Sequence, residues 1–116
     1  MKEIKPIFNV AVEYFKSFQE GNIRELSKLY HDDIHLVDWN GEWKGKETVL
    51  KMNKGLFDSN LWRNRVVVHD IDPLEFNDSR LYCKISITVG DDVLKVIDIL
   101  DFDEQSKIIK IEAFNG

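Results

Sequence analysis

Three polar side chains stand where the pattern of the sequence predicts an apolar, core-facing row. Asp98 interrupts an alternating apolar row in a strand pattern near the end of the chain. Asp38 follows Ile34 and Leu36 on one face of an earlier strand pattern, and Tyr14 lies on the apolar stripe of the first predicted helix. The apolar residues that share the row of Asp98 are Leu94, Val96, Leu100 and Phe102. Polar residues that break an apolar pattern are candidates for a functional site.

The chemistry open to these residues is proton transfer. A buried carboxyl group either finds hydrogen-bond partners or raises its pKa and becomes neutral. A neutral Asp98 beside Tyr14 would stabilise negative charge on a substrate oxygen, while an ionised Asp38 removed a proton from carbon. A structural alternative stays open, in which Asp98 faces a rim or bonds backbone amides, Tyr14 is a core residue, and Asp38 caps the following turn.

Three helices are predicted in the first half of the chain. Apolar residues recur at helical spacing from Ile4 to Phe18, and Gly21 suits the C-terminal cap. Asn22 has the side chain of an N-cap and opens a second helix, and Gly45 can open a third. The buried side of the third helix is predicted to hold Val49, Leu50, Met52, Leu56 and Phe57.

The remaining segments alternate with the period of strands. One strand is expected over 33–39, Asn40 and Gly41 form a turn, and 58–64 is predicted to be a loop. Asn77 and Asp78 are expected to form a later turn, and a bulge is expected at Pro73, which cannot donate a ladder hydrogen bond. The later strands are predicted over 65–76, 81–89, 93–102 and 107–114.

These elements predict one α+β domain over residues 1–116, in which helices pack on one face of a single curved antiparallel sheet. Some strands are apolar on both faces. We therefore expect the other sheet face to be covered by a second copy of the chain, as a homodimer.

Composition excludes several classes of partner. The 16 Lys and Arg are interleaved with 21 Asp and Glu, for a net charge of -5, so the basic stripe of a nucleic-acid binder is missing. The charged start and the lack of a long apolar run predict a cytoplasmic protein that does not bind membranes. Cys83 is the single cysteine, and its strand position favours an inert core residue.

A metal site is not favoured. His31, Asp33 and His35 form a polar cluster, but they straddle a helix-to-strand junction, and strand alternation sends His35 away from the face of Ile34. The adjacent His69 and Asp70 also point to opposite faces of their strand. We expect no metal and no other cofactor.

The residues also carry a family resemblance. The segments 13–23, 29–34 and 41–45, together with 98–103 and 107–108, resemble the nuclear transport factor 2-like superfamily. The SnoaL-like and ketosteroid-isomerase-like members are the most similar, and nearly the whole chain is covered. This resemblance implies a cystatin-like cone, in which the sheet and the helices enclose a central small-molecule pocket.

The resemblance also implies roles for the three polar residues. Tyr14, Asp38 and Asp98 match the positions of the oxyanion-hole tyrosine, the general base and the protonated oxyanion-hole aspartic acid of ketosteroid isomerases. The implied activity is that of a cofactor-independent isomerase or cyclase acting on a small apolar or carbonyl-containing ligand. Other relatives imply the alternative of a non-catalytic domain for ligand binding, dimerisation or protein interaction.

Aromatic residues set the expected shape of the pocket. Trp39 and Asn40 stand where the isomerases follow the base with proline, which predicts a reshaped mouth and disfavours a flat steroid. Trp39, Trp43 and Trp62 either line a pocket or interface or cover the open end of the sheet. The residues predicted to line the pocket are Phe18, Leu36, Trp39, Trp43, Phe57, Trp62 and Phe102.

Overall fold

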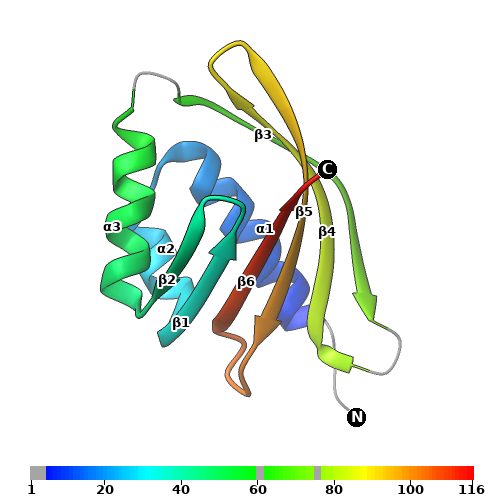
Figure 1. Cartoon of the computed structure of the whole chain (residues 1–116). Helices are drawn as coiled ribbons and strands as arrows, with labels where there is room; N and C mark the ends of the chain where they lie inside the picture. The colour runs from blue at the N-terminus through cyan, green and yellow to red at the C-terminus, as the bar shows by residue number, and fades with distance from the viewer. Residues whose placement is uncertain (1–4, 60–61, 75–76) are drawn as a thin grey trace.

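One curved sheet and a layer of helices make up the structure (Figure 1). The computed structural model describes residues 5–59, 62–74 and 77–116. Over these residues the strand order is β2-β1-β6-β5-β4-β3. The strands are β1 (Tyr30–Asp38), β2 (Gly41–Lys44), β3 (Trp62–Leu74), β4 (Asn77–Val89), β5 (Asp92–Phe102) and β6 (Ile108–Asn115). This arrangement confirms the predicted α+β class.

The helices begin and end close to the positions predicted from their caps. They are α1 (Lys5–Glu20), α2 (Ile23–Leu29) and α3 (Lys46–Phe57). Gly21 ends α1 with a φ of 66°, a conformation that glycine adopts without strain. The side chain of Asn22 accepts a hydrogen bond from the amide of Glu25 at 3.1 Å and so caps α2.

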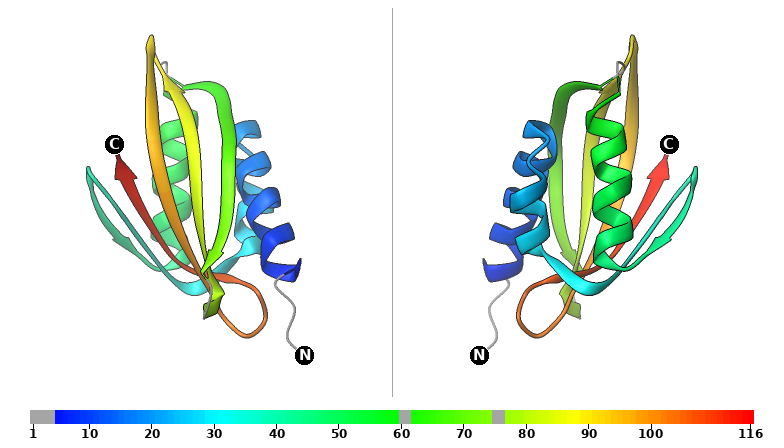
Figure 2. Two further views of the ribbon diagram at one scale, coloured as in Figure 1. Left: turned by 90° about the vertical axis from the view of Figure 1, so that its right-hand side faces the viewer. Right: turned by 90° about the vertical axis from the view of Figure 1, so that its left-hand side faces the viewer.

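The helices lie against the concave face of the sheet, and the strands bend around them (Figure 2). Alternation along β5 turns Val96, Asp98 and Leu100 toward the helices, and all three side chains are buried. Among the described residues, the sheet is antiparallel except where β1 runs parallel to β6, with Leu36 opposite Ile111. The sheet is therefore mixed, with one parallel pair.

The register along β3 shifts between Pro73 and Leu74, beside the position where proline predicted a bulge. Over the described part of the chain, no helix is long and apolar enough to cross a membrane.

Three local predictions were wrong. The strand β2 was missed, because four residues with two charged side chains show little alternation, yet β2 pairs with β1 through Leu36 and Trp43. β3 begins at Trp62, inside the segment predicted as a loop, where polar residues hid the strand pattern. Asn77 and Asp78, predicted as a turn, belong to β4, where Asn77 pairs with Leu74.

Candidate functional site

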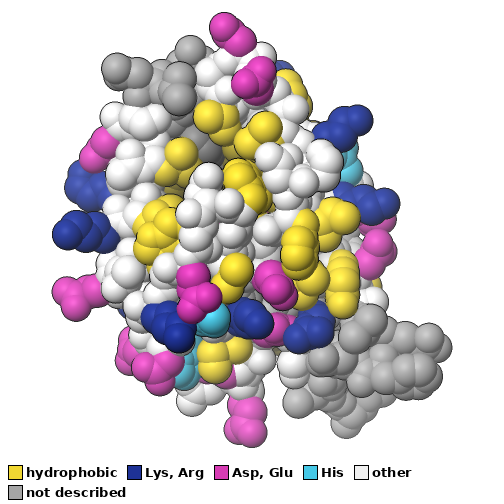
Figure 3. Space-filling view, in the orientation of Figure 1, with side chains coloured by type: hydrophobic (Ala, Val, Ile, Leu, Met, Phe, Trp, Pro, Cys, Tyr) yellow, Lys and Arg dark blue, Asp and Glu magenta, His cyan; other side chains and the backbone are white. Residues whose placement is uncertain are grey.

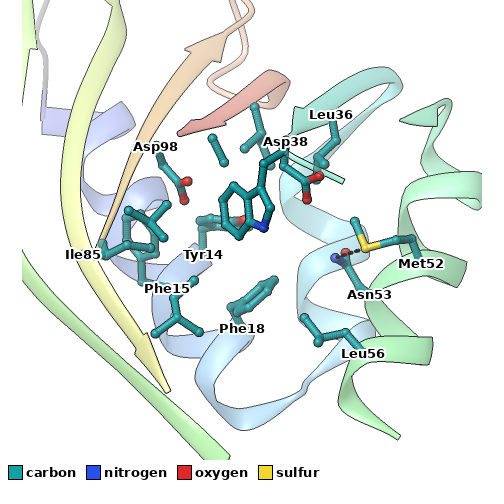
Figure 4. Close-up of a pocket in the computed structure, with 15 residues that line it drawn as sticks. Tyr14, Phe15, Phe18, Leu36, Asp38, Met52, Asn53, Leu56, Ile85 and Asp98 are labelled. Carbon is teal, nitrogen blue, oxygen red and sulfur yellow. Dashed lines mark hydrogen bonds between the residues drawn. The ribbon is translucent and has the colours of Figure 1, made fainter. Parts of the chain in front are cut away.

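A cavity of about 80 Å³ lies between the helices α1 and α3 and the concave face of the sheet. Figure 4 shows side chains from both layers around it. The lining residues are Tyr14, Phe15, Phe18, Leu36, Asp38, Trp39, Met52, Asn53, Leu56, Ile85, Ile87, Val96, Asp98, Ile111 and Ala113. Most of this wall is apolar, and the polar exceptions include the three residues that break the apolar pattern of the sequence.

Tyr14 reaches the cavity from α1. Its ring packs against Phe15 and Phe18 on the same helix, and only 4% of the residue is exposed. Burial raises the pKa of the phenol well above its ordinary value, and the nearby Tyr30, Asp98, Cys83 and Asp38 raise it further. The hydroxyl group therefore stays protonated and can donate a hydrogen bond into the cavity.

Asp98 reaches the same cavity from the middle of β5, where Cys83 of β4 and Ala113 of β6 lie opposite it. It is 6% exposed. Burial, and next the charge of Asp38, raise the pKa of this carboxyl from 3.8 to about 7. Near neutral pH a large share of the molecules therefore carry a protonated Asp98, which is a hydrogen-bond donor.

The part of the chain that the structure describes satisfies neither of these two buried groups. Among the described residues, the Tyr14 hydroxyl and the Asp98 carboxyl have no hydrogen-bond partner, although both face the cavity (Figure 4). Buried polar groups in folded proteins are usually paired, so an unpaired one calls for an explanation. A ligand oxygen in the cavity would be a suitable acceptor for both donors.

Asp38 lines the cavity from the end of β1, and it also holds the following turn. Its Oδ1 accepts backbone hydrogen bonds from Asn40 at 2.7 Å and Gly41 at 3.1 Å. The turn-capping role of the structural alternative is therefore present, and it coexists with a place on the cavity wall. These two bonds fix the orientation of the carboxyl group, which can still use its other oxygen.

Asn53 of α3 is a polar residue of the cavity that sequence reasoning missed. It is fully buried, and its Oδ1 accepts a hydrogen bond from the Tyr30 hydroxyl at 2.7 Å. The signal was present in the sequence, because Asn53 lies four residues after Val49 and three before Leu56, on the buried side of the helix. A polar residue at that spacing breaks an apolar row, as Asp98 does.

The residues predicted to line the pocket fall into three groups. Phe18, Leu36 and Trp39 line the cavity. Phe102 is buried in the core beside β6, and Trp43 packs against the core from β2. Phe57 packs edge-on against Phe18, with the ring centroids 5.1 Å apart. These last three are not among the lining residues. The cavity lies elsewhere along the sheet from Phe102 and Trp43, whereas Phe57, which follows the lining residue Leu56, turns toward Phe18 and Gly21. The side chain of Trp62 lies outside the described residues.

The other candidate groups lie apart from the cavity. His31 lies 3.8 Å from Asp103, and His35 lies 3.2 Å from Glu42, so the two imidazoles face different partners. Within residues 5–59, 62–74 and 77–116, no group of three or more potential ligands is placed to hold a metal ion. Burial, followed by the charges of Asp98 and Asp72, raises the pKa of Cys83 to about 12, so its thiol stays protonated and a weak nucleophile.

The fold and the cavity together define a class of protein: an α+β cone whose curved sheet and helices enclose a small, mainly apolar cavity. The family model described as a SnoaL-like domain matches residues 11–111. The chain therefore belongs to the SnoaL-like domain family, and its similarity to the nuclear transport factor 2-like superfamily is confirmed.

Solved structures show the same fold at low sequence identity. A steroid delta-isomerase from Pseudomonas aeruginosa has a TM-score of 0.76 and 17% identity, over 96% of this chain and 80% of that chain. An LEH-like epoxide hydrolase from M. tuberculosis has a TM-score of 0.78 and 9% identity, over 97% and 84%. A de novo designed protein with a curved β-sheet has a TM-score of 0.80 and 18% identity, over 100% and 88%. No curated protein sequence matches the chain.

Proposed function

We propose that this chain is a small-molecule-binding SnoaL-like domain that acts as a cofactor-independent isomerase or cyclase by proton transfer in its apolar cavity. The observation that carries the proposal is the pair of buried donors, Tyr14 and Asp98, which face one cavity and lack protein partners among the described residues. The likeness in fold to a protein named a steroid delta-isomerase agrees with it.

In the proposed reaction, Asp38 acts as the base. The substrate carbonyl oxygen accepts hydrogen bonds from Tyr14 and the protonated Asp98. The carboxylate of Asp38 takes a proton from the carbon next to that carbonyl, and the electron pair of the broken C–H bond moves onto the oxygen. Where a carbon–carbon double bond of the substrate extends the enolate, return of the proton from Asp38 to the far carbon shifts that double bond and completes an isomerisation. Where the substrate has a second carbonyl group, attack of the enolate carbon on it closes a ring, and the alkoxide that forms takes the proton from Asp38.

The substrate is proposed to be a small apolar carbonyl compound. Drug-sized ligands occupy pockets of about 300 to 1,000 Å³, and the cavity here has about 80 Å³. Its wall is mostly aliphatic and aromatic, with the polar groups confined to a few positions. A flat steroid is therefore a poor fit, and a ligand of a few carbon atoms is a good one.

The decisive experiment measures exchange of carbon-bound protons. Wild-type protein is incubated with 2-pentanone in D2O, and the signals of the protons beside the carbonyl are followed by NMR. We expect Asp38→Asn to slow the exchange by about a hundred- to ten-thousand-fold, because the variant lacks the base. Asparagine keeps an oxygen for the turn amides of Asn40 and Gly41, so loss of exchange would not reflect a lost turn.

A matched control is Asp33→Asn, which removes an exposed carboxylate from the same strand, outside the cavity. This variant should exchange protons at the wild-type rate. Equal rates in wild type and Asp38→Asn would show that Asp38 is not the base and would end the case for proton transfer.

A second candidate function is a non-catalytic dimerisation or ligand-binding domain, and the outer face of the sheet supports it. Four exposed apolar side chains lie on the face turned away from the helices, which we call the outer sheet patch: Val67, Val93, Ile97 and Phe114. Val93 is 63% exposed and Phe114 is 50% exposed. In Figure 3, hydrophobic side chains gather over β4 and β5, with charged side chains around them. Such patches are typical of interfaces.

A further inference from the structure

The amide of Asn53 carries a hydrogen-bond donor that the described residues leave almost unused. The side chain is fully buried, it lines the cavity, and its Oδ1 is engaged by the Tyr30 hydroxyl at 2.7 Å. Its Nδ2 contacts the sulfur of Met52 at 3.9 Å, and the described residues offer it no other acceptor. A thioether sulfur is a weak acceptor, whereas the amide nitrogen has two hydrogens to donate.

The hydrogen bond from Tyr30 fixes the orientation of the Asn53 amide. Because Tyr30 is itself buried and donates to Oδ1, the oxygen end of the amide is already engaged within the protein. The nitrogen end is then the part of Asn53 that a ligand can meet. A buried donor left without a strong acceptor reduces stability, and a ligand oxygen would remove that penalty.

The polar groups of the cavity come from two separate walls. Asp98 and Tyr14 come from β5 and α1, whereas Asn53 and Asp38 come from α3 and β1 (Figure 4). A ligand whose first oxygen lies between Tyr14 and Asp98 extends across the cavity toward Asn53. Its second half therefore meets an amide donor in an otherwise apolar surrounding.

We propose that Asn53 donates a hydrogen bond to a second oxygen of the substrate, so that the cavity selects small dicarbonyl compounds over monoketones. This inference rests on the proposed function. When Asp38 takes a proton from the carbon between two carbonyl groups, the electron pair of the C–H bond spreads over both oxygens. Tyr14 and Asp98 stabilise one oxygen, and Asn53 stabilises the other.

The volume of the cavity limits the length of such a compound. The cavity of about 80 Å³ is far smaller than the roughly 300 to 1,000 Å³ of pockets for drug-sized ligands, so it suits compounds in the size range of a few carbon atoms. Acetylacetone and 2-pentanone both fall in this range and have the same carbon chain. They differ in the second carbonyl group, which makes them a matched pair of probes.

The test compares the affinities of the two probes by NMR titration. Asn53→Leu would leave the Tyr30 hydroxyl without its acceptor, so the leucine is introduced together with Tyr30→Phe, and Tyr30→Phe alone is the control. We expect wild type and the control to prefer acetylacetone by about tenfold and the double variant to lose this preference. Thermal unfolding of each variant verifies that it is folded.

The outcomes separate this inference from the proposed function. In one outcome, both probes bind, Tyr14→Phe weakens the binding of both, and the double variant keeps the preference for acetylacetone. Asn53 then donates no hydrogen bond to a second oxygen of the ligand, and only this inference is overturned. If neither probe binds, or if Tyr14→Phe leaves both affinities unchanged, the proposed oxyanion site is overturned and the role of Asn53 with it.

Discussion

Asp98 sits in a setting that makes its ionisation costly, and its titration can be measured directly. Burial and the charge of Asp38 raise the pKa of this carboxyl to about 7. We expect carboxyl NMR to find its midpoint near pH 7 in the wild type and lower in Asp38→Asn, because that variant removes the neighbouring negative charge. A midpoint close to 4, as in an unfolded peptide, would rule out the donor role of Asp98.

The same pKa makes a prediction about stability. Between about pH 4 and pH 7 native Asp98 keeps a proton that the unfolded chain has lost, so its contribution to stability falls as the pH rises through this range. The slope approaches about 1.4 kcal/mol per pH unit. Urea unfolding should therefore show that Asp98→Asn gains stability relative to wild type from pH 4 to pH 7. A difference that stays constant over this range would contradict the raised pKa.

At the level of single residues, the sequence predicted more of the cavity's polar wall than of its apolar wall. Tyr14, Asp38 and Asp98 each broke an apolar row, and periodicity alone was enough to turn them inward. Phe102 satisfied the same periodicity and still lies off the cavity, because periodicity gives a face of the strand and not a position along it. Phe57 lies next to the lining residue Leu56, but its ring packs on Phe18 instead of entering the cavity. Asn53 also occupies the buried side of its helix, but the apolar residues around it in α3 dominate the sequence pattern, so it was not predicted.

Two glycines test the backbone conformation of the helices, one at the end of α1 and one within α3. Gly21 has a φ of 66° at the end of α1, and a Cβ there would lie 3.5 Å from the Phe57 ring. We expect Gly21→Ala to destabilise the protein by about 1 kcal/mol through backbone strain. Gly55 lies exposed within α3 with open space around it, so Gly55→Ala should stabilise by about 0.5 to 1 kcal/mol. Thermal unfolding measures both, and effects of the same sign would contradict this assignment.

The elements with strong periodic signals and caps were predicted best. The caps at Gly21 and Asn22 placed the junction of α1 and α2 correctly. β2 was missed because its partner, β1, and not its own sequence, makes it a strand. The parallel pairing of β1 with β6 also escaped prediction, since it joins segments that the order of the chain keeps far apart.

For the molecule as a whole, the outer sheet patch predicts association. If it forms a homodimer, Ile97→Lys or Phe114→Lys should shift the protein to monomer in sedimentation experiments, because each places a charge in the apolar contact. Val12→Lys is the matched control, since Val12 is 48% exposed on α1, on the opposite side of the sheet. A wild type that sediments as a monomer would remove the support for the dimer.

The parallel contact between β1 and β6 has a consequence during synthesis on the ribosome. Tyr30 pairs with Ile108, and Leu36 pairs with Ile111, so the strand that carries Asp38 has an inner neighbour that is translated only after β3, β4 and β5. Until β6 emerges from the exit tunnel, the hairpin of β1 and β2 has no place to dock, and its edge stays open to wrong partners. A nascent chain stalled before Ile108 would hold Tyr14 on its helix and Asp38 on its hairpin, and the two side chains could meet in one cavity only after β6 has been translated.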